Sequence, residues 1–177
     1  MNDRSRNIYF CGMIGSGKTT IGSYLAHELE LPLYDLDREM DRILGHSFHR
    51  LVREKGWVAF RELEYSICKR FARHEKCLIC LGGGTVRYEW NMDVLRGTGF
   101  FILLTASLDE LVRRVRNAER PRVTAGTTLE ENLRTILEQS EEKYRRAADL
   151  TYGTDEKSVE QIAAELLPAI RDYLSGC

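Results

Sequence analysis

The chain has 177 residues, a length typical of one domain, so we expect a single unit over residues 1–177. Its 43% hydrophobic and 30% charged residues are ordinary for a globular protein, which excludes a disordered or fibrous chain. The 26 basic and 27 acidic side chains give a net charge of −1, so we expect no nucleic acid as a partner.

A membrane partner is not expected either, because no apolar stretch of the sequence approaches the ~20 residues that span a bilayer. The N-terminal segment, residues 1–6, is polar and contains no hydrophobic signal core. The five cysteines are irregularly spaced, which is typical of buried thiols in a reducing compartment rather than of a disulfide framework. These features predict a cytoplasmic protein.

Short apolar runs alternate with segments of helical period, a pattern typical of βαβ units around a parallel sheet. In chain order, the predicted strands are Asn7–Cys11, Leu33–Asp35, Lys76–Leu81, Gly99–Thr105 and Leu150–Thr154. The predicted helices are Lys18–Glu30, Arg38–Leu44, Phe48–Glu54, Val58–Arg73, Leu108–Arg116, Leu129–Ala147 and Val159–Leu174. The last helix has its apolar side chains at core-facing spacing, so we expect a monomer rather than a dimer that uses this helix.

The phosphate-binding pattern G-x-x-x-x-G-K-[ST] runs from Gly12 to Thr19, between the first predicted strand and the first predicted helix. Backbone N–H groups of such a loop converge on phosphate oxygens, Lys18 reaches the outer phosphates, and the Thr19 hydroxyl can hold Mg²⁺. The residues expected to bind the nucleotide here are Gly12, Gly15, Ser16, Gly17, Lys18, Thr19 and Thr20.

The rest of the sequence favours a small-molecule kinase among the proteins with this loop. It contains neither the DxxG nor the NKxD motif of a GTPase, and the third predicted strand leads into Gly82–Gly84 instead of ending in an aspartate. Residues 117–127 contain Arg, Pro and Gly and are predicted to form a mobile lid, which a kinase needs to keep water from the phosphoryl group.

Two carboxylates, Asp35 and Asp37, follow the second predicted strand. Their two-residue spacing is expected to send both to the same side, at the carboxyl edge of the sheet where ligands bind in such folds. Asp35 is then placed near Mg²⁺, and Asp37 is placed against an acceptor hydroxyl as its orienter or base. The alternative is that an aspartate here only caps the helix that begins at Arg38.

Three further groups are candidates for binding the acceptor or the transferring group. Arg61 can clamp a carboxylate through two parallel hydrogen bonds, or it forms only a surface pair with Glu64. The Gly82–Gly84 run lets a substrate approach main-chain donors, or it is a plain turn. Arg120, in the predicted lid, can neutralise charge at the γ-phosphate, or it belongs to a solvated basic loop.

These motifs occur in an order that resembles the shikimate kinase family, a group of P-loop proteins similar to nucleoside monophosphate kinases. The resemblance extends over about residues 7–170 and rests on the P-loop, Asp35-Leu-Asp37, Phe60-Arg-Glu-Leu-Glu64, Gly82–Gly84, Arg120-Pro and Tyr144. It implies an α/β fold of three α/β/α layers, with a five-stranded parallel sheet of order 2-3-1-4-5 and a mobile lid. It also implies transfer of the γ-phosphoryl group of ATP to the 3-hydroxyl of shikimate, with Mg²⁺ as cofactor.

Site residues follow from the resemblance by position. Shikimate is expected to be held by Asp37, Arg61, Gly83 and Gly84, within an acceptor-binding subdomain over about residues 34–75. Thr19 and Asp35 are expected at the metal, Arg113 against adenine, and Arg120 over the phosphates. Lys18, Asp37 and Arg120 are the expected catalytic residues.

The sequence departs from the family at Ser140. The family usually has a second carboxylate-binding arginine four residues before the tyrosine matched by Tyr144, and here that position is a serine. Three readings remain open: another cation substitutes, the acceptor is a different hydroxylated acid or polyol, or the protein binds nucleotide without turnover. Cations that are nearby in sequence are Arg134, Lys143 and Arg145.

Overall fold

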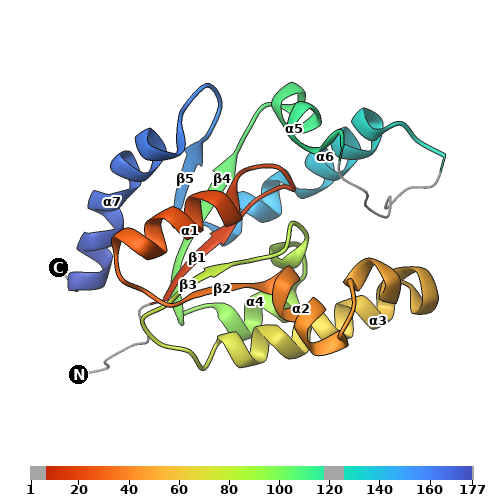
Figure 1. Cartoon of the computed structure of the whole chain (residues 1–177), viewed down its shortest axis with the longest axis horizontal. Coiled ribbons are helices and arrows are strands. Elements are labelled where there is room, and N and C mark those ends of the chain that lie inside the picture. The colour runs from red at the N-terminus through yellow and green to blue at the C-terminus, as the bar shows by residue number, and fades with distance from the viewer. Residues whose placement is uncertain (1–6, 118–125, 177) are drawn as a thin grey trace.

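A computed structural model describes residues 7–117 and 126–176 of the chain (Figure 1). The strands are β1 (Asn7–Cys11), β2 (Leu33–Asp35), β3 (Leu78–Cys80), β4 (Gly99–Thr105) and β5 (Leu150–Gly153). The helices are α1 (Lys18–Glu28), α2 (Leu36–Leu44), α3 (Phe48–Phe71), α4 (Glu89–Leu95), α5 (Leu108–Val115), α6 (Leu129–Ala147) and α7 (Val159–Ser175). A single 3-10 turn, Thr85–Arg87, precedes α4.

The five strands form one parallel sheet in the order β2-β3-β1-β4-β5, which confirms the predicted topology. β1 lies at the centre and pairs with β3 on one side and β4 on the other. Because all strands run the same way, the loops that follow β1, β2 and β3 meet at one edge of the sheet. The P-loop, Asp35 and the Gly82–Gly84 run are therefore brought together from distant parts of the sequence.

Helices cover both faces of the sheet, giving the predicted α/β/α layers (Figure 1). Alternation along β1 sends Ile8 and Phe10 to the face covered by α1 and α7, and Tyr9 and Cys11 to the opposite face. The second face is covered by α3, α4 and α6 and contains the larger apolar core. One of the two cavities described below lies on this second side, between α3 and α6, and the other lies beside the P-loop.

Two predicted helices, Phe48–Glu54 and Val58–Arg73, form one bent element. Gly56 separates them with φ 81° and ψ 178°, a conformation that interrupts a helix and that glycine adopts without steric cost. Ser47 caps the first half by accepting a hydrogen bond from the His49 amide. The second half, which contains Arg61, contributes Ile67 and Phe71 to the larger apolar core.

Three further elements differ from the sequence prediction. α2 begins at Leu36, directly after β2, so Asp37 lies in the first turn of a helix and not in an extended segment. The argument from strand periodicity for Asp35 and Asp37 was therefore wrong, although both side chains do reach the same cavity. The 3-10 turn and α4 were not predicted, because elements of three and seven residues are too short for a periodic apolar pattern.

Candidate active site

The P-loop connects β1 to α1 and places Lys18 at its centre. The Nζ of Lys18 donates to the backbone oxygens of Gly12 (2.9 Å) and Met13 (2.8 Å). Gly17 occupies the N-cap of α1 and, having no side chain, provides no capping hydrogen bond to the first turn. The N–H groups of that turn therefore point toward the loop with the positive end of the helix dipole, which is the arrangement that binds phosphate.

A hydroxyl and a carboxylate meet beside Lys18. The Oγ1 of Thr19 donates to Oδ2 of Asp35 over 2.7 Å, and Oδ1 of Asp35 accepts from the Arg38 amide over 3.1 Å. Asp35 thus caps α2, as one interpretation expected, and also contacts the P-loop through Thr19; its role at the metal stays a prediction. The Thr19 hydroxyl and the Asp35 carboxylate are hard oxygen donors, which Mg²⁺ prefers. The described residues contain no cluster of three or more His, Cys, Asp or Glu.

Next to this pair lies a cavity of about 440 Å³, here named the P-loop cavity. Its lining includes five of the predicted nucleotide-binding residues, Gly15, Gly17, Lys18, Thr19 and Thr20, together with Asp35 and Asp37. Gly12 and Ser16 shape the loop but do not line the cavity. Ser16 is buried inside the loop.

The structure distinguishes between two adjacent arginines on α5. Arg114 lines the P-loop cavity and donates to the backbone oxygens of Gly15 and Thr154, at 3.0 Å each. The Arg113 side chain is 65% exposed and pairs with Glu110 outside the cavity lining. Hydrogen bonds from Arg113 and then Arg114 lower the pKa of Glu110 to about 2. Arg114 was not among the predicted residues, because the sequence does not show which face of α5 meets the P-loop.

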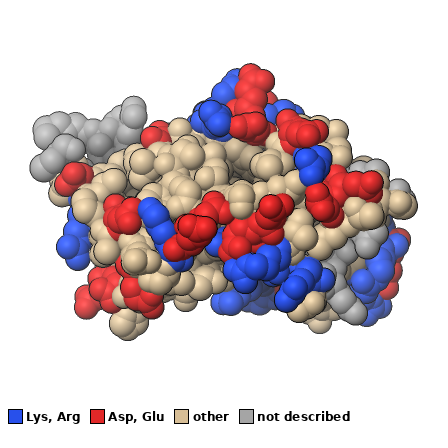
Figure 2. Space-filling model, turned by 90° about the horizontal axis from the view of Figure 1, so that it is seen from above, with Lys and Arg blue, Asp and Glu red and all other residues tan. Residues whose placement is uncertain are grey.

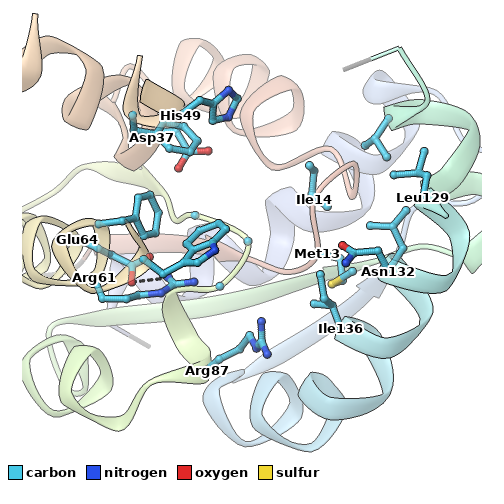
Figure 3. A pocket seen from close by; sticks show the side chains of 18 of the residues that line it. Met13, Ile14, Asp37, His49, Arg61, Glu64, Arg87, Leu129, Asn132 and Ile136 are labelled. Carbon is cyan, nitrogen blue, oxygen red and sulfur yellow. Dashed lines mark hydrogen bonds and ion pairs between the residues drawn. The ribbon is translucent and has the colours of Figure 1, made fainter. Parts of the chain in front are cut away.

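A second cavity, of about 400 Å³, lies between α3 and α6 and is here named the α3–α6 cavity (Figure 3). Asp37, Arg61, Gly83 and Gly84, the predicted acceptor-binding residues, all line it. Asp37 and Gly83 also line the P-loop cavity, so the two cavities are adjacent and share a wall. A group held in one therefore faces a group held in the other across Asp37.

Arg61 forms a buried ion pair rather than the surface pair considered from the sequence. Its Nη1 donates to Oε2 of Glu64 over 2.7 Å, and the two side chains are only 16% and 1% exposed. Glu64 also accepts from Thr85 Oγ1 (2.9 Å) and Asn91 Nδ2 (3.0 Å). The guanidinium lies over the Tyr88 ring, 4.4 Å from its centroid. Glu64 and the aromatic ring thus fix Arg61 while it lines the α3–α6 cavity.

Replacing Arg61 with methionine should lower the free energy of unfolding by about 3 kcal/mol, because it leaves the buried Glu64 carboxylate without its cation. Urea unfolding measures this change. Arg50→Met is the matched control, since Arg50 pairs with Glu54 at the surface and its loss should cost less than about 1 kcal/mol. Equal losses in the two variants would contradict the structural role assigned to Arg61.

The glycine run after β3 closes one side of the α3–α6 cavity. A Cβ built on Gly84 would lie 2.7 Å from Nη2 of Arg61, and one on Gly83 would lie 3.2 Å from the Ile14 amide nitrogen. The Tyr144 hydroxyl donates to the Gly83 carbonyl and holds this segment. Close approach to the Arg61 guanidinium and to the P-loop therefore requires glycine, and the run is more than a plain turn.

Gly84→Ala should displace the Arg61 guanidinium and leave the fold intact, because the crowded atom is the end of a flexible side chain. We expect kcat/KM for an acidic acceptor to fall by about 10-fold and KM for the nucleotide to change little, while the unfolding midpoint falls less than in Arg61→Met because the guanidinium is shifted and not removed. Steady-state kinetics measure kcat/KM and KM, and urea unfolding measures the midpoint. Gly153→Ala is the control, since the nearest atom to its built Cβ is 3.9 Å away. The same fall in both variants would count against this placement of Arg61.

The opposite wall of the α3–α6 cavity comes from α6. The Ser140 side chain is buried and donates to the Ile136 carbonyl of its own helix, so it does not reach the cavity. Arg134 and Arg145 are exposed and pair with Glu130 and Glu141, and Lys143 is also exposed. None of these three cations lines the cavity, so none replaces the missing guanidinium.

Other residues of the site lie outside the sequence-based set. His49 and Trp57 of α3 line the α3–α6 cavity. Arg120 and most of the predicted lid, residues 118–125, lie outside the described residues. Arg87 and Asn132 also line the cavity (Figure 3), and neither was identified from the sequence.

A phosphate-binding loop, a hydroxyl–carboxylate pair and an adjoining cavity with a carboxylate and a guanidinium define a P-loop kinase that acts on a small molecule. Comparison with known proteins supports this class of protein. The family profile described as shikimate kinase matches residues 14–171. The chain belongs to the shikimate kinase family.

Individual relatives support this assignment over almost the whole chain. A shikimate kinase of Chlorobium luteolum is 35% identical over 167 residues, which cover 90% of this chain and 82% of that protein. One from Coxiella burnetii is 30% identical over 177 residues and covers 99% of each chain. The solved structure of an Acinetobacter baumannii shikimate kinase in complex with shikimate has a TM-score of 0.88 and 27% identity, and it covers 95% of this chain and 94% of its own.

Proposed function

We propose that this protein transfers the γ-phosphoryl group of ATP to the 3-hydroxyl of shikimate. The observation that carries the proposal is the shared wall: Asp37 lines both the P-loop cavity and the α3–α6 cavity, and Arg61 lines the latter. A hydroxylated acid whose carboxylate binds Arg61 can then present a hydroxyl to Asp37, beside the phosphates. Family membership supports the same reaction.

The chemistry divides among few residues. Lys18 and the N–H groups at the start of α1 hold the outer phosphates, and Asp37 orients the acceptor hydroxyl and accepts its proton as the phosphoryl group departs from ADP. Arg61 fixes the acceptor through its carboxylate. Mg²⁺, held on Thr19 and Asp35, would neutralise charge on the phosphate oxygens.

Other parts of the proposal come from the sequence. Residues 34–75 act as the acceptor-binding subdomain of a single domain, and Arg120 acts from the lid at 117–127 as the phosphate-covering cation. Arg114 contacts the adenine side of the nucleotide in place of Arg113, since only Arg114 lines the P-loop cavity.

We also propose that the protein acts as a monomer in the cytoplasm, without nucleic acid or membrane partners. Four described cysteines are buried free thiols, as expected in a reducing compartment. No described helix is long and apolar enough to cross a membrane. Large exposed apolar side chains among the described residues are Ile43, Val58 and Trp90. On the face shown in Figure 2, acidic and basic side chains are intermingled rather than gathered into a basic patch.

A coupled assay of ADP release with a panel of acceptors tests the proposal. Shikimate is expected to give the highest kcat/KM, and gluconate and neutral polyols are expected to give little turnover. A higher kcat/KM with another hydroxylated acid would establish the second candidate function, which the loss of the arginine at position 140 favours. ATP binding without acceptor-dependent ADP release would identify a silent nucleotide-binding protein.

A further inference from the structure

The α6 wall of the α3–α6 cavity carries no positive charge. The α6 residues that line the cavity are Leu129, Asn132, Leu133 and Ile136, which are apolar apart from one amide. A carboxylate that enters this side of the cavity must therefore find its cation on another element. Arg61, on the opposite wall, already shares its charge with Glu64.

Arg87 is placed to provide that cation. It ends the 3-10 turn that follows Gly84, and this turn packs against α6. The side chain is half-buried and lines the α3–α6 cavity. Figure 3 shows its guanidinium directed into the space between Arg61 and Ile136. No described acidic residue forms an ion pair with Arg87, so its charge is available to a ligand.

Electrostatics place the Arg87 charge close to position 140. Tyr144, one helical turn after Ser140, is buried, and burial raises the pKa of its hydroxyl well above the usual value. Arg87 is the largest charged contribution that opposes this rise, ahead of Arg61. The charge of Arg87 therefore lies near Tyr144, one turn of α6 from position 140, and the turn that carries Arg87 packs against the same helix.

An independent observation points to a polar ligand in the same place. The Asn132 side chain lines the cavity, and its residue is only 5% exposed. Its Nδ2 is buried and has no hydrogen-bond partner among the described residues. A buried amide donor without a partner costs free energy unless a ligand satisfies it. In Figure 3 this amide lies on the α6 side of the cavity, across from Arg61.

We propose that Arg87 binds the carboxylate of the acceptor together with Arg61, in place of the guanidinium absent from position 140, and that the Asn132 amide donates a hydrogen bond beside it. This inference rests on the proposed function. It assigns specificity for an anionic acceptor to a residue that follows β3, while the family places this role on the helix that carries Tyr144. Arg61 and Glu64 together are neutral and Asp37 adds a negative charge, so Arg87 and Arg116 are the lining cations that favour an anion.

Arg87→Met tests the inference because it removes the charge and retains most of the side-chain volume. We expect kcat/KM for shikimate to fall roughly 10- to 100-fold, as the loss of a charged hydrogen-bonding pair implies. KM for ATP should stay unchanged. Methyl shikimate, which has no carboxylate charge, should show a change in kcat/KM of less than about threefold. Arg87→Lys should give an intermediate fall with shikimate, since it keeps the charge and loses the planar pair of donors.

Arg145→Met is the matched control, because Arg145 is 71% exposed and pairs with Glu141 away from the cavity. An unchanged kcat/KM for shikimate in Arg87→Met, or an equal fall with the methyl ester, would overturn the inference while leaving the proposed function intact. A selective loss in Arg116→Met alone would assign the carboxylate to that exposed cavity residue instead. If the unaltered protein does not phosphorylate shikimate, the proposed function fails first and this inference fails with it.

Discussion

Lys18→Ala is expected to lower kcat by on the order of 10³-fold or more, which abolishes useful turnover. Lys18 is the cation at the centre of the P-loop, where its Nζ contacts the Gly12 and Met13 carbonyls and lines the P-loop cavity. Charge that develops on the transferring phosphoryl group is then left without its nearest protein cation. Single-turnover measurement of ADP formation at saturating ATP and acceptor isolates this effect on the chemical step.

Lys18→Met serves as a second variant, because it keeps the side-chain stem and limits rearrangement of the P-loop. Lys69→Met is the control, since Lys69 is an exposed lysine on α3 outside both cavities. Both Lys18 variants should lose turnover, and the control should keep it. Substantial turnover in either Lys18 variant would mean that the P-loop amides and the metal suffice for transfer.

Asp37→Asn is expected to lower kcat by about 10²- to 10⁴-fold, the range for loss of a positioned general base. The amide keeps the shape of the carboxylate, but it neither accepts the hydroxyl proton nor carries negative charge. Asp37 also lines the P-loop cavity, but the P-loop and Lys18 are unaltered in this variant, so we expect the dissociation constant for ATP to change much less than kcat. Rapid-quench kinetics and calorimetric titration of ATP measure the two quantities separately.

Asp93→Asn is the control for this substitution, because Asp93 is an exposed carboxylate on α4 that lines neither cavity. It should leave kcat and ATP binding unchanged. A normal kcat in Asp37→Asn would remove Asp37 from the chemical step and leave it a role in binding only. A large loss of ATP affinity would instead place it in the nucleotide site.

The nucleotide side of the site was predictable because its chemistry is local in sequence. The loop from Gly12 to Thr19 specifies its own backbone conformation, and a strand before it and a helix after it suffice to orient it. The sheet order followed from the resemblance to a family, since periodicity predicts strands but not their neighbours. Asp35 and Asp37 reached the predicted cavity through a cap and a helical turn rather than through an extended strand.

The acceptor side could be predicted only in part. Arg61 and the glycines were predicted and do line the α3–α6 cavity, but the buried network of Glu64, Thr85 and Asn91 joins residues up to 27 positions apart and leaves no local pattern. Arg87 and Asn132 line the same cavity because α6 packs against the turn after β3. Such contacts depend on tertiary packing. The choice between Arg113 and Arg114 likewise depends on which face of α5 meets the P-loop.

The wall shared by the two cavities has a thermodynamic consequence. Asp37 and Gly83 contact whatever occupies either cavity, so occupancy of one changes the surface offered to the other. Any resulting coupling free energy must be reciprocal: the factor by which nucleotide alters the dissociation constant of the acid equals the factor by which the acid alters that of the nucleotide. The order in which the two substrates arrive therefore leaves the stability of the ternary complex unchanged.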